Sequence, residues 1–291
     1  MSKENKEKAL NRYFSQTEQY HERIDLLHGA RYFSRYVGII RPFSGHGKFL
    51  DIGCGTGWVV NHFSEAAFSD NVGVDISPSG MRIALHSSGE KGNNRFVVAD
   101  ARHLPFKNGS FAVAGALTFL EHSYTPIENL KEMIRVLRTD GKIVLCHTNF
   151  LSPFSPLVKT SFLTLLTSVI RNLFPWGGYK RFITIALKLR SNNGEPEFVN
   201  PSLDRDQIKD GMNFSNVPGV YFPSDPDAVY LVNPIDLVKT LRQLGVDIRT
   251  MTTWAAYKKP FTFINRIPYV NVIGPGCTII GRKVKQGNGR L

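Results

Sequence analysis

The sequence predicts an α/β protein whose mostly parallel sheet carries helices on both faces. Three observations support this class: short apolar strands alternate with helical segments, three glycines follow the first strand, and three successive strands end on aspartate. Strands and helices that alternate through short loops are typical of parallel βαβ units. Such sheets bind ligands at the carboxyl ends of their strands, so we expect the functional site at that edge.

Seven strands and five helices are expected, in an alternation that is lost after residue 150 and resumes at 233. The apolar periodicity predicts strands over 49–52, 71–77, 94–101, 110–119, 142–148, the second half of 233–254, and 276–284. It predicts helices over 9–40, 58–67, 78–86, 127–137 and the first half of 233–254. Ser77 is placed to cap the third of these helices, and residues 139–141 are expected to form the turn that closes the fourth.

The composition of the 291 residues is that of an ordinary globular protein, with 42% hydrophobic residues. Three widely spaced cysteines predict neither a disulfide framework nor a zinc site, and we expect no metal. The charged N-terminal residues lack the apolar core of a secretory signal peptide. These features predict a cytoplasmic protein without a signal peptide.

The stretch "FLDIGCGTGW", residues 49–58, places Gly53, Gly55 and Gly57 on alternate positions directly after an apolar strand. Glycine loses much backbone entropy on folding, so three together indicate a tight turn that a ligand approaches closely. No lysine follows the turn as it does in the GxxxxGK[ST] phosphate loop. A nucleoside triphosphate is therefore not the expected ligand.

Three aspartates accompany the glycine turn at successive strand ends. Asp75 can accept both hydroxyls of a ribose, as carboxylates do in dinucleotide folds. Asp100 can accept an exocyclic amine, and Asp51 can meet a cationic amine directly or through water. Together these groups describe a nucleoside without a long phosphate chain.

Ordered motifs in this region resemble those of the class I S-adenosylmethionine-dependent methyltransferases, most closely the branch that contains the ubiquinone/menaquinone-biosynthesis and sterol methyltransferases. The matching stretches are "LDIGCGTG" (50–57), "VGVDIS" (72–77), "VVADARHLPF" (97–106), "LTFLEH" (117–122) and "MIRVLRTDGKIVL" (133–145). The resemblance implies a Rossmann-like, seven-stranded sheet with S-adenosylmethionine as methyl donor and S-adenosylhomocysteine as product. It also implies an N-terminal helical lid over 1–44, a cofactor-binding half over 45–149, a largely helical insertion over 150–232 and a C-terminal part of the core over 233–291.

The resemblance and the strand ends together give a set of candidate site residues. The expected cofactor-binding residues are Asp51, Gly53, Cys54, Gly55, Gly57, Asp75, Ile76, Asp100, Ala101 and Leu117. The candidate catalytic residues are His122 and His147, each of which could instead satisfy a local structural hydrogen bond. The candidate substrate or lid residues are Tyr13, Phe14, Tyr20, Asn149, Trp176 and Tyr179.

The insertion contains a basic and apolar stretch, residues 153–190, with six Lys or Arg and no acidic residue. Apolar helices with basic flanks and interfacial aromatics can lie on an anionic membrane, where each basic side chain contributes about 1 kcal/mol. The same helices could instead cover the substrate pocket and bury their apolar face internally. A single membrane span over 154–174 is the third interpretation.

The leading functional hypothesis is methyl transfer to the oxygen or carbon of a small, apolar or lipid-like acceptor. Methylation of a soluble natural product or sugar is an alternative enzyme function. A binding protein that keeps the fold without catalysis, and recruits a partner through the basic insertion, is an alternative of another class. Nucleic acid is not the expected partner, since aliphatic residues interrupt the basic stretch throughout.

Overall fold

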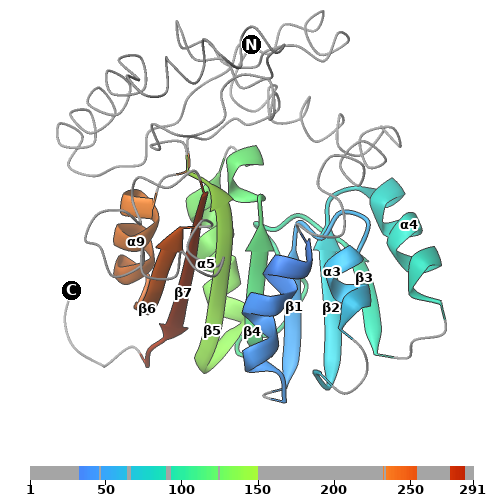
Figure 1. Cartoon of the computed structure of the whole chain (residues 1–291), viewed down its shortest axis with the longest axis horizontal. Coiled ribbons are helices and arrows are strands. Elements are labelled where there is room, and N and C mark those ends of the chain that lie inside the picture. Colours follow the sequence, from blue (N-terminus) through green and yellow to red (C-terminus); the bar gives the residue numbers. More distant parts are fainter. Residues whose placement is uncertain are drawn as a thin grey trace, which may run out of the picture.

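The computed structural model describes residues 33–45, 47–63, 67–89, 93–123, 125–149, 232, 234–253 and 276–285. Within them a seven-stranded sheet has the order β3-β2-β1-β4-β5-β7-β6 (Figure 1). Its strands are β1 (Lys48–Ile52), β2 (Asp70–Asp75), β3 (Asn94–Val98), β4 (Phe111–Leu117), β5 (Leu137–Thr148), β6 (Val246–Thr253) and β7 (Gly276–Lys283). Strands β1 to β5 are parallel, whereas β7 is antiparallel to both β5 and β6. The predicted fold class, a Rossmann-like and mostly parallel sheet, is confirmed.

The helices that cover the sheet follow the predicted alternation. They are the helical residues 33–40, η1 (Arg41–Phe43), α3 (Trp58–His62), α4 (Pro78–Ser88), η2 (Leu120–His122), α5 (Pro126–Val136) and α9 (Pro234–Gln243). Residues 33–40 confirm the end of the helix predicted over 9–40, and the earlier part of that helix lies outside the described residues.

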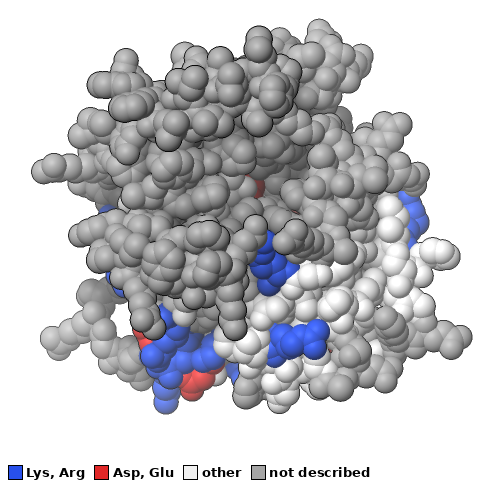
Figure 2. Space-filling model, viewed as in Figure 1, with Lys and Arg blue, Asp and Glu red and all other residues white. Residues whose placement is uncertain are grey.

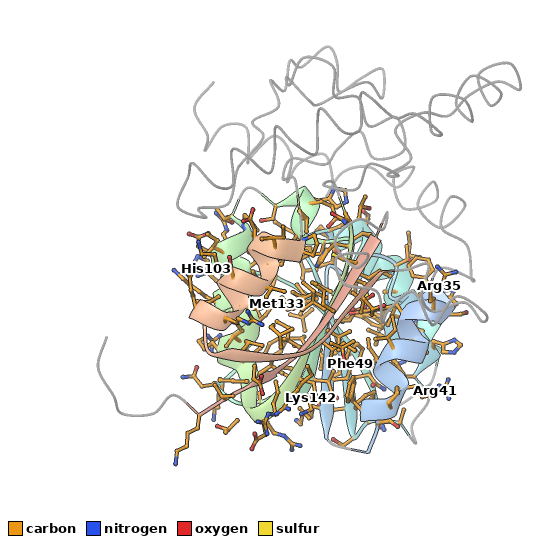
Figure 3. All side chains as sticks on the ribbon, turned by 60° about the vertical axis from the view of Figure 1, so that its left-hand side comes forward. Arg35, Arg41, Phe49, His103, Met133 and Lys142 are labelled. Carbon is orange, nitrogen blue, oxygen red and sulfur yellow. The ribbon has the colours of Figure 1, made fainter. Side chains whose placement is uncertain are left out.

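Two apolar cores lie on the two faces of the sheet. Successive side chains of a strand point to opposite faces, so Phe49 packs with residues 33–40 and α3, while Leu50 packs with α5 and α9. Figure 3 shows Phe49 on the side of the sheet that carries residues 33–40, and Met133 on the opposite side toward α9. The prediction of helices on both faces is therefore confirmed.

The start of α4 follows the predicted capping chemistry. Ser77 Oγ accepts a 3.1 Å hydrogen bond from the Gly80 N–H, and Pro78 occupies the first helical turn, where its missing donor is harmless. The helix ends at Ser88, two residues beyond the predicted end, and Gly89 is its C-cap residue. This cap fixes α4 directly after the end of β2.

The structure corrects the predicted bounds of several elements. Helix α3 ends at His62 rather than residue 67, because Phe63 is extended at φ −79° and ψ 101°. Strands β2 and β3 end at Asp75 and Val98, before the predicted residues 77 and 101, because Ser77 already caps α4 and Asp100 turns to accept a bond from the Arg102 N–H.

The turn predicted over 139–141 is wrong, because these residues belong to β5. The ladder between β4 and β5 pairs Phe111 with Leu137 and next pairs Val113 with Lys142. The intervening residues form an irregularity in which Asp140 has a φ of 64°. The turn-forming residues therefore form a bulge inside a longer strand.

Charged side chains of both signs gather at the lower left of the molecule in Figure 2, the side on which β5, β6 and β7 lie in Figure 1. Arg282 lies 3.4 Å from Asp140 and 3.6 Å from Asp247, and Arg249 lies 2.8 Å from Asp247. Lys142 and Arg282 flank this end of the β5–β7 ladder, where β5 begins its regular pairing. These charges are paired at the edge opposite the carboxyl ends of the parallel strands. Within the described residues, no helix has the length and apolar composition needed to cross a bilayer.

Candidate active site

The turn after β1 holds three glycines in the left-handed region, with φ of 70° at Gly53, 54° at Gly55 and 74° at Gly57. A Cβ at Gly53 would lie 2.6 Å from the ring of Phe119, and one at Gly57 would lie 2.5 Å from Phe96. Backbone angle and packing therefore both require glycine at these two positions. No atom of the residues that the structure describes lies within 4 Å of the place that a Cβ of Gly55 would take. The middle glycine therefore borders open space, in which a ligand can approach the backbone.

Asp75 stands at the end of β2, beside the glycine turn. Its Oδ2 accepts a 3.0 Å hydrogen bond from the Gly55 N–H, and its Oδ1 accepts a 2.9 Å bond from the Ser77 N–H. These two bonds hold the carboxylate between the turn and the start of α4. An ionised carboxylate has about four lone-pair sites, which is the acceptor chemistry that the two hydroxyls of a ribose need.

Asp51 is buried on the sheet face that residues 33–40 cover, with 3% of its surface exposed. The Tyr36 hydroxyl lies 3.5 Å from Asp51 Oδ1 and fills the space that Gly115 leaves, where a Cβ would fall on the hydroxyl oxygen. Burial raises the pKa of Asp51 from 3.8 to about 8; the hydrogen bond from Tyr36 lowers this pKa and the charge of Asp75 raises it. The carboxyl therefore holds a proton at neutral pH, which a nearby cation would displace.

Asp100 follows β3, and its carboxylate accepts hydrogen bonds from the guanidinium and the backbone N–H of Arg102. The guanidinium Nε lies 3.0 Å from both carboxylate oxygens, Nη2 lies 2.6 Å from Oδ2, and the Arg102 backbone N–H donates a 2.9 Å bond. Burial by itself raises the pKa of Asp100, but these contacts outweigh it and hold the pKa below the ordinary value. Arg135 of α5 fixes the loop that follows, by donating to the carbonyl oxygens of Leu104 and Phe106. Asp100 is therefore an oriented anion at the third strand end.

A buried polar pair lies where β4 and β5 end. His147 Nδ1 is 3.0 Å from Glu121 Oε2, and both side chains have no exposed surface. Their contact joins η2 to β5. Sequence reasoning proposed His147 for the site and did not single out Glu121, although "LTFLEH" contains it.

Thr118 and Phe119 form a second feature that sequence reasoning missed. Thr118 has a φ of 46°, which is costly for a β-branched side chain, and its N–H donates a 2.8 Å bond to the Cys146 carbonyl. The turn at Thr118 brings the Phe119 ring against Gly53. No sequence pattern indicates a left-handed threonine, and the role of Tyr36 is equally hidden within a helical stripe of aromatic residues.

The other predicted site residues lie as follows. Cys54 Sγ packs 4.0 Å from Met81 Sδ, inside the turn. Three half-buried residues follow or end strands at the carboxyl edge: Ile76, Ala101 and Leu117. His122 ends η2, and Asn149 is fully buried directly after β5. The predicted lid and substrate residues outside the described ranges are Tyr13, Phe14, Tyr20, Trp176 and Tyr179.

The sheet order and the glycine turn define the class I fold of S-adenosylmethionine-dependent methyltransferases. The residues at the turn fit this cofactor: the described residues leave open space at Gly55, Asp75 holds an acceptor carboxylate beside it, and Asp51 is a buried carboxyl that a cation would ionise. Among the described residues, no three His, Cys, Asp or Glu side chains are grouped as a metal site.

Comparison with known proteins agrees with this class. Residues 50–145 match the family model described as a methyltransferase domain. The chain therefore carries a methyltransferase domain of the class I, S-adenosylmethionine-dependent type.

Two curated relatives are similar to about half of the chain. The ubiquinone/menaquinone biosynthesis C-methyltransferase of Citrifermentans bemidjiense is 31% identical over 144 residues, which are 48% of this chain and 60% of that protein. The norajmaline N-methyltransferase of Rauvolfia serpentina is 31% identical over 132 residues, which are 43% of this chain and 45% of that protein. The match thus spans less than two thirds of the length of either relative.

A solved structure extends the similarity of the fold to most of the chain. The geranyl diphosphate C-methyltransferase of Streptomyces coelicolor, in complex with S-adenosyl-L-homocysteine, has a TM-score of 0.52 at 11% identity. The alignment covers 92% of this chain and 85% of that chain. At this identity the comparison bears on the fold alone.

Proposed function

We propose that this protein transfers a methyl group from S-adenosylmethionine to the oxygen or carbon of a small, apolar or lipid-like acceptor. The observation that carries the proposal is the open space at Gly55, flanked by the carboxyl groups of Asp51 and Asp75 at the ends of adjacent strands. S-adenosylmethionine supplies an already activated methyl group, with the electron pair of the broken sulfur–carbon bond retained by sulfur. The protein then has mainly to align the acceptor and exclude water.

Each strand end has a defined part in holding the cofactor. Asp75 accepts the ribose hydroxyls, Asp100 accepts the exocyclic amine of adenine, and Asp51 ionises beside the ammonium of the amino-acid end. The N–H of Gly55, which now donates to Asp75, keeps that carboxylate turned toward the open space. Asp75→Ala should lower the affinity for S-adenosylhomocysteine at least tenfold in calorimetry, since two hydrogen bonds to a carboxylate are lost. Unchanged affinity would remove Asp75 from the site.

The apolar acceptor is supported by a curated relative and by the sequence of the insertion. One relative is named for ubiquinone/menaquinone biosynthesis. The stretch 153–190 combines aliphatic runs with six basic residues, as expected for a cover that opens toward a lipid surface. In this proposal the segments 1–44 and 150–232 cover the acceptor, and the protein is a peripheral, cytoplasmic enzyme.

A labelled-cofactor experiment tests the acceptor class directly. The protein is incubated with methyl-labelled S-adenosylmethionine and a total cell extract, and the label is followed into the organic and aqueous phases by mass spectrometry. Label in an organic-phase product supports the proposal. Label confined to the aqueous phase favours the second candidate, a soluble natural product, which the similarity to a norajmaline N-methyltransferase supports. The absence of any cofactor-dependent product would favour a non-catalytic protein.

Vesicle flotation tests membrane contact separately from catalysis. The protein is mixed with vesicles of phosphatidylcholine alone or with added phosphatidylglycerol, at low and high salt. We expect flotation only with the anionic vesicles at low salt, and less of it after the double change Lys180→Ala and Arg181→Ala. The matched control is the double change Lys107→Ala and Lys131→Ala, which removes the same charge from two exposed residues outside the insertion. Equal flotation of both double variants would argue against a membrane role for the insertion.

A further inference from the structure

The buried pair Glu121–His147 leaves two polar atoms without partners. Among the described residues, neither Nε2 of His147 nor Oε1 of Glu121 has a hydrogen-bond partner, although both side chains are fully buried. A buried polar atom without a partner costs about 1–3 kcal/mol, and such atoms are rare in native proteins. Two of them on one hydrogen-bonded pair, at the carboxyl edge of the sheet, indicate a place where a polar ligand atom binds.

The charge of Glu121 determines which nitrogen of His147 carries the proton. Burial by itself raises the pKa of Glu121, but the hydrogen bond from His147 and the charges of His147 and His122 outweigh it and hold the pKa below its ordinary value. An ionised carboxylate can only accept a hydrogen bond. The Nδ1 of His147 therefore donates to Glu121, and in the neutral imidazole the lone pair lies on Nε2.

The residues next to His147 in the ladder between β5 and β7 carry no charge that competes with Glu121. Cys277 of β7 is the ladder partner of His147, and burial raises the pKa of its thiol, which is therefore neutral. Cys146 and Thr278, one residue away along each strand, hydrogen bond to each other on the opposite face of the sheet. Within the part of the chain that the structure describes, the carboxylate that contacts the imidazole is that of Glu121, which can stabilise a positive charge on the ring.

We propose that Glu121 is a positioning residue that holds His147 as the general base for an acceptor carrying an acidic hydroxyl, a phenol or an enol. The acceptor O–H bond breaks, its proton moves to Nε2 of His147, and its electron pair stays on the acceptor. That pair, on the oxygen or on a conjugated carbon, forms the new bond to the methyl group, and the imidazolium is stabilised by Glu121. This inference rests on the methyl transfer proposed above, and it names the acceptor class.

The need for a base separates this acceptor class from amines. A phenol has an ordinary pKa near 10, so at neutral pH it reacts well only if a base takes its proton. A neutral amine already has the lone pair that forms the new bond. A buried base at the acceptor side is therefore useful for O- and C-methylation, and it is of little use for N-methylation of amines that are already neutral at pH 7.

Nitrogen NMR on protein labelled at histidine tests the pair without any acceptor. In the wild type bound to S-adenosylhomocysteine, we expect His147 to carry its proton on Nδ1. Glu121→Gln keeps the shape of the side chain and removes its charge, so the Nε2-protonated form should become populated. Glu128→Gln, on the exposed face of α5, is the matched control and should leave the His147 signal unchanged. A wild-type His147 protonated on Nε2 alone would overturn the proposal.

The rate of labelled-product formation from methyl-labelled S-adenosylmethionine and a lipid extract tests the catalytic role. We expect Glu121→Gln and His147→Gln each to slow product formation about 100-fold or more, with affinity for S-adenosylhomocysteine within twofold of the wild type. Because the two residues act as a unit, the double variant should be no slower than His147→Gln alone. The control His86→Gln changes an exposed histidine of α4 and should keep the wild-type rate.

The outcomes distinguish this inference from the proposed function. If the wild type forms no labelled product, the proposed function fails and the acceptor class fails with it. If the wild type is active and Glu121→Gln is equally fast, only the role of the pair is wrong. If the enzyme is active and the label lies solely on a nitrogen atom of the product, the hydroxyl acceptor is wrong and the proposed methyl transfer still holds.

Discussion

The hydroxyl of Tyr36 lies 3.5 Å from Oδ1 of Asp51, so the helical residues 33–40 reach the strand end that enters the glycine turn. Both groups are fully buried, and burial raises the pKa of each. The contact joins the segment before the core to the candidate cofactor site. Several measurable properties depend on it.

The first prediction concerns the pH dependence of cofactor binding. The Asp51 pKa of about 8 means that a cationic ligand must displace a proton at neutral pH. We expect the affinity for S-adenosylhomocysteine to rise from pH 6 to 7.5, approaching about tenfold per pH unit. Calorimetry in two buffers of different ionisation enthalpy should show close to one proton released at pH 6.5.

Asp51→Asn is the control for this titration, because the amino group of the ligand also titrates near pH 8. The variant should bind more weakly than the wild type, with a nearly flat affinity below pH 7.5 and no proton release. Proton release that persists in Asp51→Asn would assign the titration to another group.

The second prediction concerns stability without ligand. Between its ordinary pKa of 3.8 and the folded value of about 8, Asp51 holds a proton in the folded protein that the unfolded chain releases. The free energy of unfolding therefore falls as the pH rises through this range, and the stabilising proton is fully present only below about pH 4. The asparagine of Asp51→Asn does not titrate, so the free energy of unfolding of this variant does not fall in this way. Relative to the wild type, it should gain on the order of 4 kcal/mol between pH 5 and pH 8.5, measured by denaturant unfolding. Parallel pH profiles for the two proteins would contradict the raised pKa.

The third prediction uses two glycines with almost the same backbone angle. Gly55 has a φ of 54° and Gly89 a φ of 56°, and both border open space. Alanine at either position should therefore cost at least about 1–2 kcal/mol of stability, and more at Gly89, whose ψ of −145° lies outside the left-handed helical region. Only Gly55→Ala places a methyl group in the candidate cofactor space, so it alone should weaken S-adenosylhomocysteine binding, by tenfold or more. Equal binding by both variants would move the cofactor away from Gly55.

The fourth prediction tests the fit between Tyr36 and Gly115. A Cβ at Gly115 would fall on the Tyr36 hydroxyl, so Gly115→Ala should destabilise the fold by about 1–3 kcal/mol. Tyr36→Phe in the same protein removes the oxygen and should restore part of the loss. Gly38→Ala is the control: Gly38 is an exposed helical residue with free space around it, and alanine there should stabilise by about 0.5–1 kcal/mol. Additive effects of the Gly115 and Tyr36 changes would show that the two residues do not meet as described.

Much of the core could be predicted because local patterns decide it. The alternation over residues 49–148 gave the parallel strands in order, and Ser77 followed by Pro78 marked the start of α4. Bounds were less predictable where tertiary contacts override local preference. Residues 139–141 have the composition of a turn, yet they form an irregularity inside β5, because Leu137 and Lys142 on either side of them both pair with β4.

The sequence by itself determined the methyltransferase fold and its donor side, because the glycines and the three aspartates lie within short, ordered motifs. Only the tertiary structure decided which distant groups meet. Tyr36 and Asp51 are brought together by a helix that packs across β1, and Glu121 meets His147 because β4 and β5 end side by side. Burial then sets their chemistry: it raises the pKa of Asp51, and it would raise that of Glu121 if the hydrogen bond from His147 and the charges of His147 and His122 did not outweigh it. Such effects depend on the loss of water around a pair of groups, which no spacing along the chain encodes.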